Sequence, residues 1–456
     1  HPLHPEVLFR SAHVYYAQRD YQTALQSTKR LIRRFSEHPR VPEAQALRGD
    51  ILMAMGELDR AIQAFRQVPP EAARLYDYAT FQTGKIYRAL KRYDLLRNHL
   101  QAYVDRDDAN ERPRVSEALY WIGWSLQQQA RSEQALPIYE QALQRFGNDP
   151  AAEAVDSMLS AYAKLYQDAA AKATDRCDFD SWLQRARAQS LEDGKLCWFA
   201  RLVAFKAERQ RHTSGTSAAE ATLLLIHRVV PIEQQAPATL ASVGLALANR
   251  GYASAEAYFK HLLRAYPKRA ERASAYYGKA QLAAKQQRLE AARRWLMRLL
   301  TETPAHPLAT EARLLNARLL SRQQQYDCAR AALNEILQTK HMRGRPHARA
   351  LAALARIEMQ RDMPRRAIAY WQRIYTLYRA YPEMIIEAYW HSAQLFEAIG
   401  DPLAARNTLR ELLSDARLKD FEVYQRARAK LPALEALAQT AQAPASQPSI
   451  SEQMPQ

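Results

Sequence analysis

Residues 241–267 read ASVGLALANRGYASAEAYFKHLLRAYP. The stretch holds a turn at residues 250–252, an alanine at Ala255, a large ring four positions later at Phe259, and a proline at Pro267. We take Ala255 as the anchor of a repeat. Equivalent anchor residues occur at nine positions along the chain, which are Ala24, Ala61, Leu96, Ala135, Ala255, Ala292, Ala329, Ala367 and Ala405. Successive anchors lie 37, 35, 39, 120, 37, 37, 38 and 38 residues apart. The spacing predicts a repeat of about 37 residues, with two drifted repeats between residues 150 and 240.

Two further positions keep a fixed distance from each anchor. A small residue precedes it by twelve positions, with Val243 as the exception: Ala12, Gly49, Gly84, Gly123, Ala280, Ala317, Ala355 and Ala393. A large residue follows it by four positions, with Thr28 as the exception: Phe65, Leu100, Tyr139, Phe259, Leu296, Leu333, Trp371 and Leu409. Helices approach closely where a small residue leaves room for a large one. The pattern therefore predicts antiparallel helical hairpins joined by tight turns.

Composition excludes several classes of protein. Glycine is scarce, with 12 in 456 residues, and the glycines are scattered, which disfavours a phosphate-binding loop. No run of 18 apolar residues exists, so the sequence predicts no membrane-spanning helix. Zinc-protease and serine-hydrolase motifs are missing as well, and we expect no catalytic activity, no cofactor and no metal site.

The pattern resembles the tetratricopeptide repeat. Gly84 with Tyr87 matches the first half of that repeat best, and Ala255, Phe259 and Pro267 match the second half. Two departures are the missing first-helix tryptophan in most repeats and the period of 37–38 residues in place of 34. The resemblance implies an all-α fold, a right-handed solenoid of about eleven helical hairpins.

The linkers between repeats carry a second resemblance. Residues 35–44 (FSEHPRVPEA) and 303–312 (TPAHPLATEA) are similar to linkers of bacterial envelope repeat proteins, such as the outer-membrane assembly lipoprotein and the Tol–Pal accessory protein. This implies a periplasmic or outer-membrane-associated location, with a cytoplasmic one left open. His1 aligns with His38 and His306 inside such a linker, which predicts that further repeats or a signal precede it.

Four segments are expected. Residues 1–150 form the N-terminal repeats, 151–236 form drifted repeats or a hinge, 237–437 form arginine-rich C-terminal repeats, and 438–456 form a disordered tail. Three cysteines leave two alternatives open, which are free thiols throughout or a bridge between Cys177 and Cys197.

The repeat family also implies where a partner binds, because its first helices line a concave surface. In the N-terminal half the corresponding residues form an aromatic groove with two cations, suited to a protein or peptide ligand: Tyr78, Phe81, Lys85, Arg88, Tyr120, Trp124 and Gln127. The alternative is that half of these rings belong to the core between repeats. The chaperone-tail clamp of this family needs asparagine where the chain has His13, Asp50, Lys85 and Trp124, so we expect no chaperone tail to bind.

In the C-terminal half the corresponding positions are basic: Lys285, Arg318, Arg322, Arg349 and Arg356. Residues 264–298 hold ten basic and two acidic residues, and residues 341–379 hold nine and two, within a chain of net charge +17. A solvated basic face, an acidic protein or anionic polymer as partner, and nucleic acid are three interpretations, the last disfavoured because aromatic residues do not alternate with the cations.

The expected function is that of a non-catalytic scaffold for protein–protein interaction in a bacterial envelope complex. Two alternatives stay open at this point. One is a nucleic-acid-associated regulator that uses the arginine-rich half, and the other is the periplasmic repeat arm of an anionic polysaccharide export system.

Overall fold

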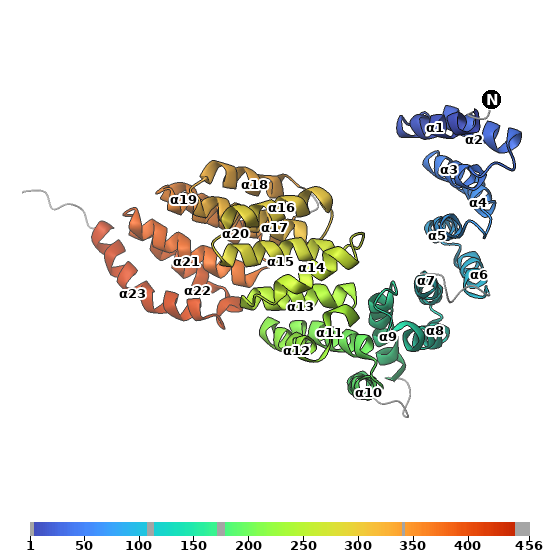
Figure 1. Cartoon of the computed structure of the whole chain (residues 1–456). Coiled ribbons are helices and arrows are strands. Elements are labelled where there is room, and N and C mark those ends of the chain that lie inside the picture. Colours follow the sequence, from blue (N-terminus) through green and yellow to red (C-terminus); the bar gives the residue numbers. More distant parts are fainter. Residues whose placement is uncertain (1–3, 107–113, 171–177, 340–342, 443–456) are drawn as a thin grey trace, which may run out of the picture. The chain divides into compact units, whose positions relative to one another are not determined.

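The protein is all-helical throughout the part that the structure covers. The computed structural model describes residues 4–106, 114–170, 178–339 and 343–442, which form 23 α-helices and no strand (Figure 1). Consecutive helices pack against each other from α1 to α12 and from α14 to α23. The predicted all-α architecture of about eleven stacked hairpins is confirmed, with α23 following the last pair.

The helices have the following bounds. The first twelve are α1 (His4–Ala17), α2 (Tyr21–Arg34), α3 (Val41–Ala54), α4 (Leu58–Arg66), α5 (Ala73–Ala89), α6 (Tyr93–Val104), α7 (Val115–Gln128), α8 (Ser132–Phe146), α9 (Val155–Ala170), α10 (Phe179–Glu192), α11 (Leu196–Thr213) and α12 (Thr216–Val229). The others are α13 (Pro237–Arg250), α14 (Ala255–Ala265), α15 (Arg272–Lys285), α16 (Leu289–Glu302), α17 (Leu308–Arg322), α18 (Tyr326–Gln338), α19 (Arg345–Gln360), α20 (Pro364–Leu377), α21 (Pro382–Ala398), α22 (Pro402–Ser414) and α23 (Glu422–Gln442).

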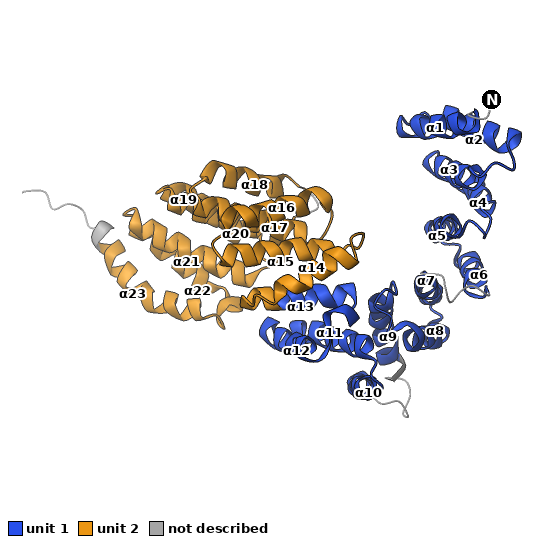
Figure 2. Cartoon of the chain, viewed as in Figure 1, with its two compact units in different colours: residues 1–246 blue, residues 247–456 orange. Residues whose placement is uncertain are grey.

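The chain divides into two compact units, residues 1–246 and 247–456 (Figure 2). The division falls within α13. In both units several odd-numbered helices contact the next odd-numbered helix, as α1 does α3 and α17 does α19. The first helices of these successive hairpins therefore lie side by side. Helices α9 to α12 occupy the region where the repeat pattern degrades.

Small residues let the helices of a stack approach closely. All nine anchor residues are fully buried, and the eight large residues that follow them are at most 2% exposed. A Cβ atom added to Gly49 would overlap the ring of Phe65, and one added to Gly123 would overlap Tyr139. In these two repeats the predicted contact between a small and a large residue is therefore present, and it fixes the spacing of the two helices.

A residue in the left-handed backbone region closes the predicted turns. It is Gly56 with φ 79° between α3 and α4, and Ala130 with φ 57° between α7 and α8. The residue that follows donates its amide to a carbonyl five positions earlier, as Glu57 N does to Leu52 O at 2.9 Å. This geometry satisfies carbonyl groups that the helix end leaves free.

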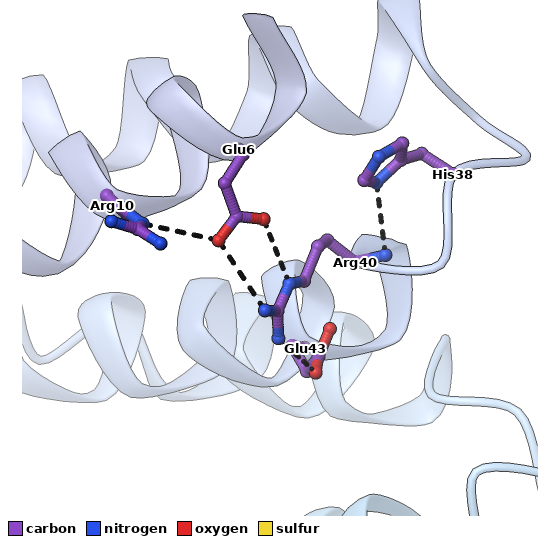
Figure 3. A network of polar contacts seen from close by, with 5 residues as sticks. All are labelled: Glu6, Arg10, His38, Arg40 and Glu43. Atoms are coloured by element: carbon purple, nitrogen blue, oxygen red, sulfur yellow. Dashed lines mark hydrogen bonds and ion pairs between the residues drawn. The ribbon is translucent and has the colours of Figure 1, made fainter. Parts of the chain in front are cut away.

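The linker motif has a structural role of its own. His38 Nδ1 accepts a hydrogen bond from Arg40 N at 3.2 Å, and His306 Nδ1 accepts one from Leu308 N at 3.1 Å. Figure 3 shows that Arg40 also reaches Glu6 and Glu43, at 3.1 Å and 2.8 Å. The histidine therefore caps the turn before a first helix, and the arginine ties that helix to the previous hairpin.

Several predictions concern the end of the chain and its cysteines. Helix α23 runs to Gln442, so residues 438–442 are helical and the predicted start of disorder at 438 is wrong. The rest of the predicted tail, residues 443–456, and Cys177 lie outside the described residues, while Cys197 is buried. The Cys177–Cys197 bridge stays a prediction.

No helix within the described ranges is long and apolar enough to cross a membrane.

The turn geometry predicts a stabilising substitution. Ala130 holds a backbone conformation that costs a residue with a Cβ atom about 1 kcal/mol, and glycine avoids most of that cost. Ala130→Gly should therefore raise the midpoint of urea-induced unfolding. Ala221→Gly, at an exposed position inside α12, is the matched control and should lower stability by about 1 kcal/mol. A lower midpoint for Ala130→Gly would show that the turn does not constrain the hairpin.

Candidate functional site

A cavity of about 890 Å³ lies in the second unit, on the first helices α17, α19 and α21. Its apolar part includes Leu314, Ala352 and Ile357. Four of the arginines predicted at partner-binding positions line it together, and they are Arg318, Arg322, Arg349 and Arg356. The repeat thus brings residues from two helices, up to 38 positions apart in sequence, to one site.

Ion pairs connect α19 with both of its neighbours at the cavity. Arg349 forms a two-pronged contact with Glu311 on α17, with its Nη2 atom 2.8 Å from Oε2. On the other side, Arg345 Nη2 lies 2.5 Å from Glu383 Oε1, and Arg356 Nη2 lies 3.2 Å from Glu387 Oε2. The α19 arginines are therefore already paired with glutamates, and these ion pairs hold the three helices in register.

Arg318 and Arg322 differ from the α19 arginines. Both are exposed, one turn apart on α17, and neither forms an ion pair with any of the residues that the structure describes. Two positive charges at this spacing repel each other, and an anion bound near them offsets that repulsion. The fifth predicted cation, Lys285 on α15, does not line this cavity. Its Nζ atom donates a hydrogen bond to the carbonyl oxygen of Asn249.

The sequence did not reveal all of the cavity. Arg345 and the three glutamates that pair with α19 were missed as site residues. A signal for two of the pairs was present, since Glu311 and Arg349, and likewise Arg345 and Glu383, are separated by 38 residues, one repeat length. Equal positions in successive first helices lie side by side, so opposite charges one period apart predict such ion pairs.

Tyr78 belongs to a polar cluster on α3 and α5 of the first unit. Its hydroxyl donates to Asp50 Oδ1 at 2.7 Å and accepts from Gln82 Nε2 at 2.7 Å. Burial, together with the Asp50 bond, raises the pKa of Tyr78 to about 12. Burial also raises the pKa of Asp50, against the hydrogen bond from Tyr78 and the positive charges of His13 and Lys85.

Arg88 and Trp124 meet between α5 and α7. The Arg88 guanidinium carbon lies 4.9 Å from the ring centre of Trp121 and 5.9 Å from that of Trp124. The neighbouring α7 residues face α8 instead. Tyr120 stacks on Tyr139 with ring centres 6.2 Å apart, and Gln127 Oε1 accepts a hydrogen bond from the Tyr139 hydroxyl at 2.8 Å.

Phe81 does not lie on the surface, which corrects its assignment to the groove. Its side chain is 1% exposed and packs edge-on against Trp121 and Tyr103, at centroid distances of 5.4 Å and 5.7 Å. Arg114 covers its ring at 3.6 Å. The ring fills the space between α5 and the next hairpin, so it supports the face and cannot touch a partner directly.

Across residues 4–442, apart from the three internal gaps, no group of three His, Cys, Asp or Glu side chains could hold a metal ion.

Comparisons with known proteins identify the repeat. Tetratricopeptide repeat family models match residues 9–79 and 241–307, and a second such model matches residues 117–149. These matches show that the chain contains tetratricopeptide repeats. No curated protein sequence matches the chain.

The solved structures that match the chain are distant from it in sequence. Yeast Tom70 is 12% identical, with 96% of this chain and 97% of that one covered and a TM-score of 0.35. The human IFIT1 dimer with PPP-AAAA is 12% identical, with 83% and 91% covered and a TM-score of 0.39. A tetratricopeptide repeat protein from Parabacteroides merdae is 15% identical, with 60% and 98% covered and a TM-score of 0.34.

The raised pKa of Asp50 predicts a pH-dependent stability. Folding raises the pKa of Asp50, so at pH values just above the usual aspartate pKa the native state binds more protons than the unfolded state. The free energy of unfolding therefore falls as the pH rises through that window. Asp50→Asn should therefore be more stable than the wild type at pH 7, with an advantage that disappears toward pH 3.

Urea midpoints measured between pH 3 and pH 7 provide the test. Asp168→Asn, an exposed position on α9 with the same change in charge, is the control and should leave the difference close to zero. An Asp50→Asn variant that is less stable than the wild type at pH 7 would contradict the assignment.

Proposed function

We propose that the chain is a non-catalytic scaffold whose second unit binds an acidic segment of a partner protein in the α17–α19–α21 cavity. Tetratricopeptide repeats typically serve as protein-binding scaffolds, and three segments of this chain match models of that repeat. The proposal adds the site and the chemistry of the ligand to that general role.

The observation that carries the proposal is the pair Arg318 and Arg322. Each guanidinium presents several donors in a planar fork that suits a carboxylate, and neither forms an ion pair with any of the described residues. The half-buried Ala353 and Met384, which also line the cavity, can accept a hydrophobic side chain. An acidic peptide with a large apolar residue uses both features, and a small anion uses only the first.

The same cavity disfavours nucleic acid as the ligand. Proteins that bind single strands stack the bases on aromatic side chains. No aromatic residue is found among the described residues that line this cavity.

The proposal also includes a location in a bacterial envelope. Its support is the resemblance of the linkers at residues 35–44 and 303–312 to those of envelope repeat proteins. The identity of the recovered partner tests this part independently of the site.

Reversal of the α17 charges should abolish binding. A tagged full-length chain is used to recover partners from native cells, with and without nuclease, and bound proteins are identified by mass spectrometry. For Arg318→Glu/Arg322→Glu we expect the main partner to be lost, because two lost charge-assisted contacts cost about 3 kcal/mol, roughly a hundredfold in affinity.

The matched control is Arg294→Glu/Arg365→Glu, which makes the same change in charge on α16 and α20, away from the cavity. It should retain the partner. Peptides that tile the recovered protein then locate the bound segment, which should carry a net negative charge. Equal loss in both variants, or loss on nuclease treatment, would contradict the proposal and would indicate general electrostatic attraction or nucleic acid.

A further inference from the structure

A second groove lies in the first unit, on the helices where the repeat pattern degrades. It has a volume of about 1080 Å³ and is lined by residues of α10, α11 and α12. All of its lining residues belong to residues 180–229, so it is distinct from the α17–α19–α21 cavity. Nothing in the proposed function uses this surface.

Large apolar side chains are exposed in this groove. Leu191 is 45% exposed, Leu225 is 38% exposed and Val229 is 37% exposed, and all three line it. Leu225 and Val229 lie one turn apart on α12, while Leu191 lies on α10. Single exposed apolar residues are common on protein surfaces, but a group that lines one concave groove marks an interaction site.

The charges in the groove indicate what the occupant carries. Arg187 and Lys206 line it without an ion pair to any described residue, and the Nε atom of Arg187 is buried and lacks an acceptor. The acidic lining residue, Asp180, is engaged by Arg209 at 3.1 Å. The groove therefore presents uncompensated positive charge beside an apolar surface, and it is complementary to an acidic amphipathic partner.

The walls of the groove favour a helix as the occupant. A segment buried there finds only helices around it, and the backbone groups within helices already bond to one another. An extended segment would leave its own amides without partners, whereas a helix satisfies them internally. Helices α10 and α12 have 14 residues each, about 21 Å, which is long enough to contact about four turns of a docked helix.

We propose that the α10–α12 groove binds an acidic amphipathic helix of a partner protein, with the apolar face of the helix on Leu191, Leu225 and Val229 and its acidic residues near Arg187 and Lys206. This makes the chain a scaffold with two separate sites, one in each unit.

A designed peptide tests the proposal directly. The probe is a fluorescein-labelled 18-residue helix with leucine at positions spaced by three and four residues and glutamate beside them; a second probe replaces every glutamate by lysine. Both are titrated by fluorescence anisotropy into the full chain carrying Arg318→Glu/Arg322→Glu, so that the other cavity does not contribute. We expect the glutamate peptide to bind and the lysine peptide to bind at least tenfold more weakly.

Variants of the groove identify the site. Leu225→Glu and, separately, Arg187→Gln/Lys206→Gln should each weaken binding of the glutamate peptide at least fivefold. Leu95→Glu, at a 46% exposed leucine on α6, is the matched control and should change it less than twofold. The double glutamine variant replaces polar ends only, so it tests the proposal even if Leu225→Glu disturbs folding, which circular dichroism reports.

Three results would overturn the proposal. They are no binding of the glutamate peptide, binding that the groove variants leave unchanged, and a concentration-dependent dimer that Leu225→Glu dissociates, which would assign the groove to a second copy of the chain. Because the background variant removes the cavity arginines, each of these results leaves the proposed function of the second unit intact.

Discussion

A large side chain of a second helix lies against a first-helix residue that has little or no side chain. Phe65 on Gly49 and Tyr139 on Gly123 are two such contacts, and at both glycines a single added carbon would overlap the ring. This steric constraint sets the distance between helices and the register of each hairpin. All nine anchor residues are fully buried, so each recognisable repeat places its anchor in the interior.

The chemistry of the surface follows from that register. Once equal positions of successive first helices lie side by side, residues one repeat apart become neighbours, as Glu311 and Arg349 do. In the second unit this arrangement uses the α19 arginines to join three helices and leaves Arg318 and Arg322 on α17 without acidic partners among the described residues. The same repeat register thus produces both the ion pairs that join the helices and the unpaired arginines proposed to bind a ligand, and it uses different residues for the two roles.

Much of the fold could be predicted because packing leaves a periodic trace. The anchors, the turns at Gly56 and Ala130 and the capping histidines all keep fixed positions in the repeat. Site residues leave a weaker trace. Phe81 was assigned to the surface because an aromatic residue on a first helix can face either a ligand or the next hairpin, and the period is the same for both. The α10–α12 groove carried no signal, since it lies where the repeat pattern is lost.

The central claim is that the second unit holds an acidic segment of a partner protein between Arg318, Arg322 and the apolar part of the cavity. Photo-crosslinking in native cells tests it most directly, with benzoylphenylalanine in place of Ala353, which lines the cavity, and in place of Ala257, an exposed residue of α14. The account predicts that position 353 alone crosslinks to a protein and that the crosslinked peptide is acidic. Crosslinks to nucleic acid, or the same products from both positions, would contradict it.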